Sequence, residues 1–478
     1  MLMKRLLLCL LTAGTLLNAG GNQTFQDGDV VGFCGDSLTH AGYSEVNYTH
    51  VLFNYYVTHF PEREIELRNL GVGRATILHG LDLYEQDPAA RGLTKVVLEY
   101  GINDTKNLYE SPEFYTDSKK TERNSLQDFT NSLEQFLKLL QKDGIESRDV
   151  FAATLPIPKA LSPEDAADQA LPQTRLQAGY ENRANVIRDF ASLNSTGLLE
   201  FRLPLTRLWQ TLYAENQEPS ENIMEDDELH LNTAGQIYLA YLFLEQQGAL
   251  QDVSNIKISG DSISAENADV SNFHYEEDYL YYDYRADSLP MGISSEYFEA
   301  DEFLNILDRM NREIIQAEGL QEESLYDIYI NGEKIGSWSG KELANGVNIA
   351  NITENPSQAY AAVIEQMNRG RRVAELEYRE IVQNFTDCGT GETTEEELLA
   401  AYQTWQEEDT QYRQNMYELA QERTGTVERV AIVRQGALAP DEAFKTPVSS
   451  HKKAAVFILT AGVLLSAAGW CFIRKRKF

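Results

Sequence analysis

The stretch that most constrains the fold is residues 30–39, where an apolar run stops at Gly35-Asp36-Ser37 and polar residues follow. A short apolar run of this kind predicts a buried strand, and a glycine directly after it predicts a tight turn into a helix. Ser37 would then present its hydroxyl at the carboxyl edge of a parallel sheet, where α/β proteins place their sites. Gly-Asp-Ser alone is a common turn, so it indicates a site only together with companion residues.

Alternating strand and helix patterns follow this stretch. Strands are expected at residues 30–34, 64–70, 95–100, 149–154 and 198–201, and helices at 46–60, 125–142, 174–193 and after Asn232. This alternation predicts an α/β fold, a three-layer sandwich with a parallel sheet.

Three further blocks lie at strand ends or just before the last helix of this region. They are Asn69-Leu70-Gly71-Val72-Gly73, Gly101-Ile102-Asn103-Asp104 and Asp227-Glu228-Leu229-His230. With Gly35-Asp36-Ser37-Leu38 in front, their order and spacing resemble the SGNH (GDSL-type) hydrolase family over roughly residues 28–247. The resemblance implies a flavodoxin-like sandwich and a serine ester hydrolase that needs no metal or organic cofactor.

Acyl transfer from an ester needs an activated nucleophile, a base held in one tautomer, and donors aimed at the developing oxyanion. The resemblance assigns these roles to Ser37 as nucleophile, His230 as base and Asp227 as the group that orients His230. It assigns the oxyanion hole to the Ser37 amide, the Gly73 amide and the Asn103 side chain. Arg74 departs from the pattern; it would contact an acidic substrate or, the interpretation we favour, neutralise acidic neighbours.

Charge and cysteine content exclude several classes of function. The net charge of −33 argues against nucleic acid as a partner, because phosphate binding needs clustered Lys and Arg. Of the four cysteines, Cys9 and Cys471 lie in apolar end segments, and Cys34 is expected to be a small buried residue. We therefore expect neither a disulfide framework nor a zinc site.

The two ends of the chain predict its location. Residues 1–19 have the basic start, apolar run and small-residue end of a cleaved signal peptide. Residues 454–473 carry no charge and are long enough for a transmembrane helix, and the basic tail at 474–478 is expected in the cytoplasm. These features predict a single-pass protein with an extracellular body, resembling Gram-positive bacterial surface proteins. No sortase sorting signal precedes the apolar run, so a retained helix is favoured.

Between these ends we expect a hydrolase domain at 20–250, an accessory α+β region with a helical hairpin at 251–435, and a linker at 436–453. The accessory region should contain a helix at 295–317, a β-hairpin turning at Asn331-Gly332, and two helices at 358–385 and 394–423. The region resembles a tail found after some bacterial SGNH domains. Its acidic helices are expected to be a solvated spacer or a packing partner.

The sequence thus predicts a surface-bound serine esterase that removes small acyl (acetyl) groups from carbohydrate. The polar or aromatic residues after Ser37 (Thr39, His40, Tyr43 and Ser44) favour a sugar over an acyl chain. A Tyr-rich segment at 275–284 would stack on sugars or form half-buried sheet. The alternatives are a lipase, lysophospholipase or thioesterase, an acyltransferase, and a surface scaffold with a vestigial hydrolase domain. Oligomeric state is left open.

Overall fold

The computed structural model describes residues 23–42, 44, 46–109, 125–157, 172–214, 223–227, 229–386 and 389–447. The predicted signal peptide, transmembrane helix and basic tail lie outside the described residues. Within the described ranges, no helix combines the length and the apolar character needed to cross a membrane. The chain forms two compact units. Of the described residues, the first unit comprises those up to Leu52, Ile65–Ala249 and Arg371–Thr410, and the second comprises Phe53–Glu64, Leu250–Gly370 and those from Gln411 onward.

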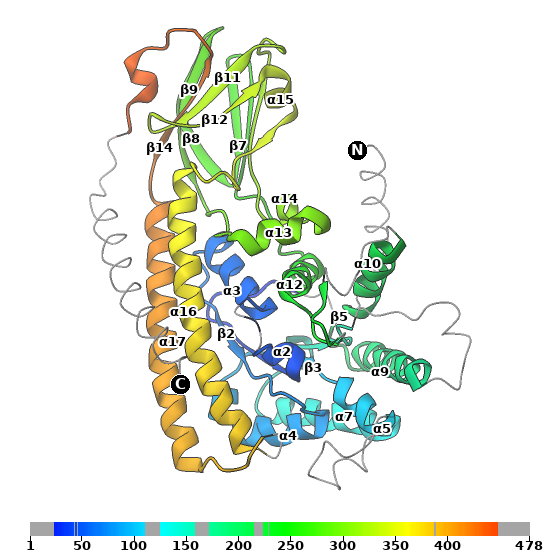
Figure 1. Cartoon of the computed structure of the whole chain (residues 1–478). Helices are drawn as coiled ribbons and strands as arrows, with labels where there is room; N and C mark the ends of the chain where they lie inside the picture. The colour runs from blue at the N-terminus through cyan, green and yellow to red at the C-terminus, as the bar shows by residue number, and fades with distance from the viewer. Residues whose placement is uncertain are drawn as a thin grey trace. The chain divides into compact units, whose positions relative to one another are not determined.

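The first unit contains a five-stranded sheet in the order β2-β1-β3-β4-β5 (Figure 1). Every neighbouring pair is parallel. The strands are β1 Val30–Gly35, β2 Glu66–Asn69, β3 Lys95–Glu99, β4 Val150–Ala153 and β5 Gly197–Leu199. The predicted α/β core with a parallel sheet is therefore confirmed. Because parallel strands end at the same edge, the turns after β1, β2 and β3 are neighbours.

Helices connect these strands and cover both faces of the sheet. They are α2 Ser37–His40, α3 Tyr48–His59, α4 Ile77–Gln86, α5 Ile102–Tyr109, α7 Leu126–Lys142, α9 Pro172–Asn194, α10 Arg202–Ala214 and α12 Thr233–Gln247, with one-turn helices η1 Pro88–Ala90 and η3 Ser147–Asp149.

Alternate residues of each strand face opposite layers, as strand geometry requires. Cys34, Val96 and Val150 join one apolar core with residues of α4, α7 and α9. On the other face, the Phe33 ring lies 5.7 Å from Tyr48 of α3 and 5.8 Å from Phe243 of α12. Figure 1 shows α4 and α7 on one side of the sheet and α12 on the other. The arrangement has the three layers that the sequence predicts.

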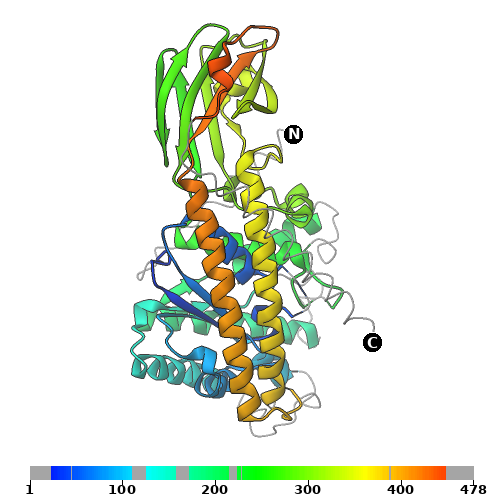
Figure 2. The same cartoon turned by 90° about the vertical axis from the view of Figure 1, so that its left-hand side faces the viewer.

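A long helical hairpin contributes to the core of the first unit. It consists of α16 Pro356–Phe385 and α17 Glu395–Thr424, which run antiparallel (Figure 2). Tyr378 of α16 stacks on Trp405 of α17 with ring centroids 5.1 Å apart, and both belong to the core that contains Cys34. The sequence-based division places residues 371–410 in the accessory region, whereas in the structure they pack with the hydrolase sheet.

The hairpin also covers the edge strand β2. The Arg371 guanidinium donates to the carbonyl of Leu67 in β2 and forms a buried ion pair of 2.7 Å with Asp409. An uncovered edge strand would present unpaired backbone groups to other chains. Of the two roles that the sequence left open for the hairpin, solvated spacer or packing partner, the structure therefore shows the packing partner. The predicted capping box at the start of α17 is also present, because Thr394 and Glu397 bond reciprocally.

The second unit is built on two sheets. One has the order β13-β10-β6-β7 and the other β12-β11-β14-β9-β8. Their strands are β6 Ser254–Ser259, β7 Ser262–Glu266, β8 Ala268–Tyr275, β9 Tyr279–Ala286, β10 Glu313–Glu318, β11 Leu325–Ile330, β12 Glu333–Ser339, β13 Val347–Asn348 and β14 Glu428–Arg434. Ile256 and Ile315 from one sheet share an apolar core with Tyr282 and Ile432 from the other. The two sheets therefore pack against each other.

The described part of the second unit also contains short helices: α13 Ser295–Leu304, α14 Leu307–Met310, α15 Gly340–Asn345 and η4 Asp441–Phe444. The helix predicted over 295–317 is confirmed at 295–304 and is wrong for the rest of that range, which is not one continuous helix. Asn305 adopts a left-handed backbone (φ 52°) that ends α13, and the Asp301 carboxylate accepts hydrogen bonds from the amides of Ile306 and Leu307. Residues 313–318 then alternate between buried and more exposed side chains, and they form β10 instead of helix.

The predicted β-hairpin is present as β11 and β12. Asn331 and Gly332 have φ of 53° and 85°, the positive values that a type I′ turn needs. The sequence-based linker begins at 436, yet residues 441–444 form η4, and Ala443 packs against Ala431 and Val433.

Candidate active site

The turn after β1 fixes the position of Ser37. Asp36 is the N-cap of α2, and its Oδ1 accepts a 3.0 Å hydrogen bond from the Leu38 amide. Ser37 is the first residue of α2. Amides in the first turn of a helix have no acceptor within the helix, so the N–H of Ser37 faces outward from the helix start.

A closed loop before α12 brings His230 to this turn. Met224 and Leu231 form an antiparallel bridge, which closes the loop. Asp227 Oδ1 accepts hydrogen bonds of 2.9 Å from the amides of Leu229 and His230. Asp227 Oδ2 binds Nδ1 of the His230 ring, and His230 Nε2 lies 2.8 Å from Ser37 Oγ. The structure therefore places the three predicted triad residues in one hydrogen-bonded chain.

The local environment keeps Asp227 ionised. Burial works to raise its pKa, but hydrogen bonds from the His230 amide and ring outweigh burial and hold the pKa below its usual range. An ionised carboxylate at Nδ1 fixes the tautomer of the imidazole and stabilises the imidazolium that forms when Nε2 accepts a proton.

The loop after β2 carries the predicted donor Gly73. Its neighbours are tied down: the Gly71 amide donates to Asn69 Oδ1 (2.9 Å), and the Val72 amide donates to the Gly35 carbonyl (3.1 Å). The described part of the chain offers no acceptor for the Gly73 amide. The buried Asn103 at the start of α5 reaches the same loop, because its Nδ2 donates to the Ala75 carbonyl at 3.0 Å. The three predicted oxyanion donors thus lie on adjacent strand ends.

Residues 33–236 match the model of the GDSL-like lipase/acylhydrolase family. This segment is a GDSL-like acylhydrolase domain. The match contains the segments of Ser37, Gly73, Asn103 and His230, and it makes the chain a serine ester hydrolase. The resemblance inferred from the four blocks is thereby confirmed for this part of the chain.

One solved structure resembles the chain beyond the GDSL-like domain. A gut microbial diltiazem-metabolizing enzyme superposes with a TM-score of 0.72 at 20% identity, covering 87% of this chain and 100% of that chain. This likeness shows the fold alone. An acetyl xylan esterase (22% identity, 45% and 98% covered, TM-score 0.37) and an acetylxylan esterase from Geobacillus stearothermophilus (17%, 47% and 95%, 0.38) match only part of the chain. No curated protein sequence matches the chain significantly.

Three buried carboxyl groups lie around the catalytic turn of the GDSL-like domain. Burial raises the pKa of Asp36 to about 7 and that of Asp104 to about 6, and it raises the pKa of Glu99 well above its usual range. Asp104 accepts hydrogen bonds of 3.3 Å from the Ile77 amide at the start of α4, and Glu99 accepts one of 3.0 Å from the Thr39 hydroxyl. These contacts orient the catalytic loops.

The residues after Ser37 do not form the polar lining that the sequence suggests. Thr39 is buried against Glu99 and Tyr48, and the buried Ser44 donates to the Val46 carbonyl. That interpretation is wrong for these two side chains, because both are buried and bind groups inside the protein; Tyr43 lies outside the described residues. Burial, with Arg372 and Arg379 nearby, lowers the pKa of His40 to about 3, so its ring is neutral.

Arg74, beside the predicted oxyanion donor, is exposed and has a left-handed backbone with φ of 67°. Its guanidinium makes no hydrogen bond or ion pair with any residue in the described ranges. The favoured neutralising role is therefore not seen within those ranges. Such a backbone is unfavourable for a residue with a Cβ, and strain of this kind concentrates at functional sites.

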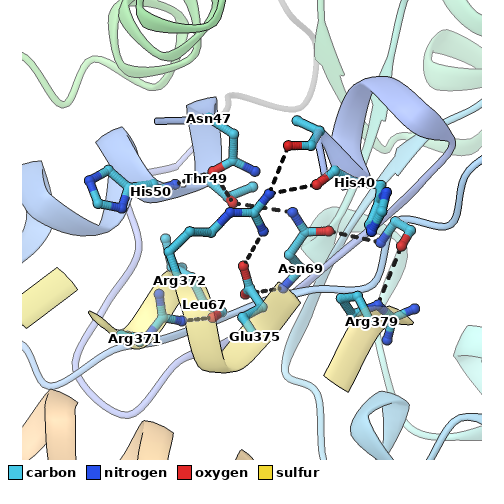
Figure 3. A network of polar contacts seen from close by, with 12 residues as sticks. His40, Asn47, Thr49, His50, Leu67, Asn69, Arg371, Arg372, Glu375 and Arg379 are labelled. Atoms are coloured by element: carbon cyan, nitrogen blue, oxygen red, sulfur yellow. Dashed lines mark hydrogen bonds and ion pairs between the residues drawn. The ribbon is translucent and has the colours of Figure 1, made fainter. Parts of the chain in front are cut away.

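The sequence analysis missed a set of α16 side chains that reach the catalytic loops, of which Figure 3 shows Arg372, Glu375 and Arg379. They are Arg372, Glu375, Arg379 and Gln383. The available signal was their spacing of three, four and four residues, which places them on one face of a helix. Charged residues at this spacing are more often solvated, and the sequence does not show that this face is buried.

Proposed function

We propose that the GDSL-like domain hydrolyses esters with Ser37 as the nucleophile, His230 as the general base and Asp227 as the group that orients His230. The observation that carries the proposal is the 2.8 Å contact between His230 Nε2 and Ser37 Oγ, while Nδ1 binds Asp227. With its proton held at Nδ1, the ring has a free electron pair at Nε2, facing the hydroxyl.

In the first half of the reaction, Nε2 takes the proton from Oγ as Oγ attacks the ester carbonyl carbon. The tetrahedral intermediate collapses when the imidazolium gives that proton to the departing alkoxide, which leaves as an alcohol. Water then adds to the acyl-enzyme by the same proton transfers, releasing the acid and restoring Ser37. The complete reaction consumes only the ester and one water molecule.

The negative charge on the carbonyl oxygen needs preorganised donors. The proposal assigns these to the Ser37 amide, the Gly73 amide and the Asn103 side chain. The open start of α2, the Gly73 amide without a described acceptor, and the approach of Asn103 to Ala75 support it.

We further propose that the substrates are small acyl esters, acetyl groups on carbohydrate above all. In the described ranges, none of the large hydrophobic side chains with substantial exposure belongs to the segments that carry the catalytic residues; they are Leu126, Leu193, Phe298, Leu325, Leu399 and Leu438. A long acyl chain needs an apolar surface, and the described parts of the segments around Ser37, Gly73, Asn103 and His230 expose no large hydrophobic side chain that would form one. The net charge of −33 also opposes binding to anionic lipid surfaces.

We also propose that the body acts outside the cell, exported by residues 1–19 and held by a membrane helix at 454–473. Protease added to intact cells should then digest the body, which should fractionate with membranes. Release by cell-wall hydrolase without detergent would point to covalent wall attachment instead.

The test of the catalytic assignment uses the purified protein and its Ser37→Ala variant. Wild type should hydrolyse an aryl acetate and form a covalent adduct with a fluorophosphonate probe, whereas Ser37→Ala should do neither. Removal of one hydroxyl at the exposed Ser264 provides the matched control, and Ser264→Ala should behave as wild type. Retained turnover in Ser37→Ala would overturn the assignment.

A further inference from the structure

We propose that one face of α16 positions two catalytic loops, which are the turn that carries Ser37 and the loop after β2 that carries Gly73 (the oxyanion loop). This face is formed by Arg372, Glu375, Arg379 and Gln383. The GDSL-like domain would then depend for turnover on a helix far outside residues 33–236. The inference rests on the proposed function, because it assigns a role in the same reaction.

The four residues form a continuous polar row in an otherwise packed environment. Their spacing along α16 places them on one face of the helix. The side chains of Arg372, Glu375 and Arg379 are 2%, 3% and 1% exposed, and Gln383 is half-buried. Charged groups buried to this degree must find partners, and here most of the partners are backbone groups of the catalytic loops.

Arg372 holds the end of the short helix that begins with Ser37. Its Nη2 donates to the carbonyls of His40 (2.6 Å) and Ala41 (3.2 Å), as Figure 3 shows for this region. Glu375 pairs with Arg372 at 2.5 Å and accepts a 3.2 Å hydrogen bond from the Asn69 amide. Because α2 has only four residues, fixing its end also fixes its start at Ser37.

Arg379 binds the start of the oxyanion loop. Its Nε donates to the Gly71 carbonyl and its Nη2 to the Leu70 carbonyl, both at 3.3 Å, while Nη1 pairs with Asp87 at 2.5 Å. No residue with a side chain fits at position 71, because a Cβ there would lie 2.3 Å from the His40 backbone nitrogen. The loop is thus pressed against α2 on one side and bound by α16 on another.

Gln383 completes the row at Gly73. Its Nε2 donates to the Gly73 carbonyl at 3.2 Å, which fixes the peptide plane after Gly73. The plane before Gly73 is fixed by the Ala75 amide, which donates to the Val72 carbonyl at 3.2 Å. The Gly73 N–H lies in the plane before Gly73. Holding the plane after Gly73 as well limits rotation about the two backbone bonds of its Cα, so the N–H keeps its direction. That N–H is the donor proposed for the oxyanion.

A purely structural role would not need this chemistry. Buried ion pairs add little net stability compared with apolar side chains of similar size, so an apolar face would cover the sheet edge as well. What apolar side chains cannot do is bind carbonyl oxygens and fix peptide planes. The polar row therefore points to positioning of the catalytic loops.

The test compares Gln383→Met with Glu377→Met in the full chain. Both variants put Met on α16, and Gln, Glu and Met have similar helix propensities. The two sites differ in burial, because Glu377 is exposed and Gln383 is half-buried. Gln383→Met should lower kcat about tenfold, the effect of losing one hydrogen bond that orients a donor, with KM within about twofold. Its affinity for a phenylboronic acid, which forms a tetrahedral adduct on serine, should fall in proportion. Glu377→Met should match wild type in each measurement.

A second readout does not depend on turnover. Amide hydrogen exchange in a peptide covering residues 70–75 should be faster in Gln383→Met than in Glu377→Met. An unchanged kcat in Gln383→Met at 20 °C would overturn the positioning role, whether or not the melting temperature falls. The proposed function would still stand in that case, provided that Ser37→Ala is inactive. If Ser37→Ala retains turnover, the proposed function fails first and the inference fails with it.

Discussion

The carbonyl oxygen of Gly73 accepts a 3.2 Å hydrogen bond from the side-chain amide of Gln383, which lies 310 positions further along the chain. The segment that matches the GDSL-like model ends at residue 236, so it does not contain this helix. The core of the first unit shows the same dependence, because it includes Tyr378 and Trp405. The hydrolase unit is therefore discontinuous in sequence.

Asn103→Ala is expected to lower kcat by about 10²–10³-fold, the usual loss when one oxyanion donor is removed, with a smaller effect on KM. The variant also loses the hydrogen bond to Ala75, so part of the effect comes from a looser loop. Steady-state kinetics on an aryl acetate measure both constants. A change mainly in KM would mean that Asn103 binds the substrate and its transition state equally, which contradicts an oxyanion role.

Asp36→Asn should make the stability less dependent on pH. The folded-state pKa of Asp36 is about 7 against a reference value of 3.8, so the folded protein holds a proton that the unfolded chain releases between these values. The free energy of unfolding therefore falls as pH rises from about 4 to 7. Asparagine stays neutral and can still accept from the Leu38 amide. The melting temperature of Asp36→Asn should exceed that of wild type above pH 7.

This gain should disappear below pH 4, where Asp36 is protonated in both states of the wild-type protein. The exposed Asp189 provides the control, and Asp189→Asn should show no such trend. Thermal unfolding at pH 4, 6 and 8 decides the matter. An Asp36→Asn variant that is less stable than wild type at pH 8 would mean that the carboxylate is stabilised by contacts stronger than its burial cost.

Local patterns explain what the sequence could predict. The apolar run ending at Gly35 marks β1 without any knowledge of the fold, and Asp227 reaches His230 across three residues in one turn of chain. The approach of His230 to Ser37, 193 positions away, follows only once the blocks are placed on a parallel sheet. The order of the strands in the sheet then brings the catalytic segments to the same edge.

The mistakes share one cause, which is that burial depends on distant partners. Arg372 and Arg379 are buried because loop carbonyls and Asp87 receive them, and nothing local to α16 reveals those acceptors. Residues 313–318 pair in parallel with β6, far earlier in the chain, and this pairing overrides the helical pattern that precedes them. Likewise Thr39 is polar yet buried, because Glu99 and Tyr48 bind its hydroxyl.

Trp405→Ala should destabilise the protein by about 3–5 kcal/mol, the range for removing a buried Trp from a core. Trp405 is 4% exposed and stacks on Tyr378. Leu399→Ala on the same helix is the control; Leu399 is 48% exposed, so its loss should cost less than about 0.5 kcal/mol. Urea unfolding, with esterase activity followed in parallel, measures both. Equal stability of the two variants would mean that α17 does not contribute to the hydrolase core.

Acyl-chain preference decides between the carbohydrate esterase and the lipase or thioesterase alternatives. Because the described parts of the catalytic segments expose no large hydrophobic side chain, lengthening the acyl chain should add little binding energy. We expect kcat/KM for aryl acetate to exceed that for aryl octanoate or palmitate, and acetate to be released from acetylated polysaccharide. A set of aryl esters from two to sixteen carbons measures the trend, with Ser37→Ala as the blank. An apolar groove would instead raise kcat/KM with each added methylene, by up to about fourfold for ~0.8 kcal/mol. A steady rise beyond butyrate would assign the protein to the lipase class.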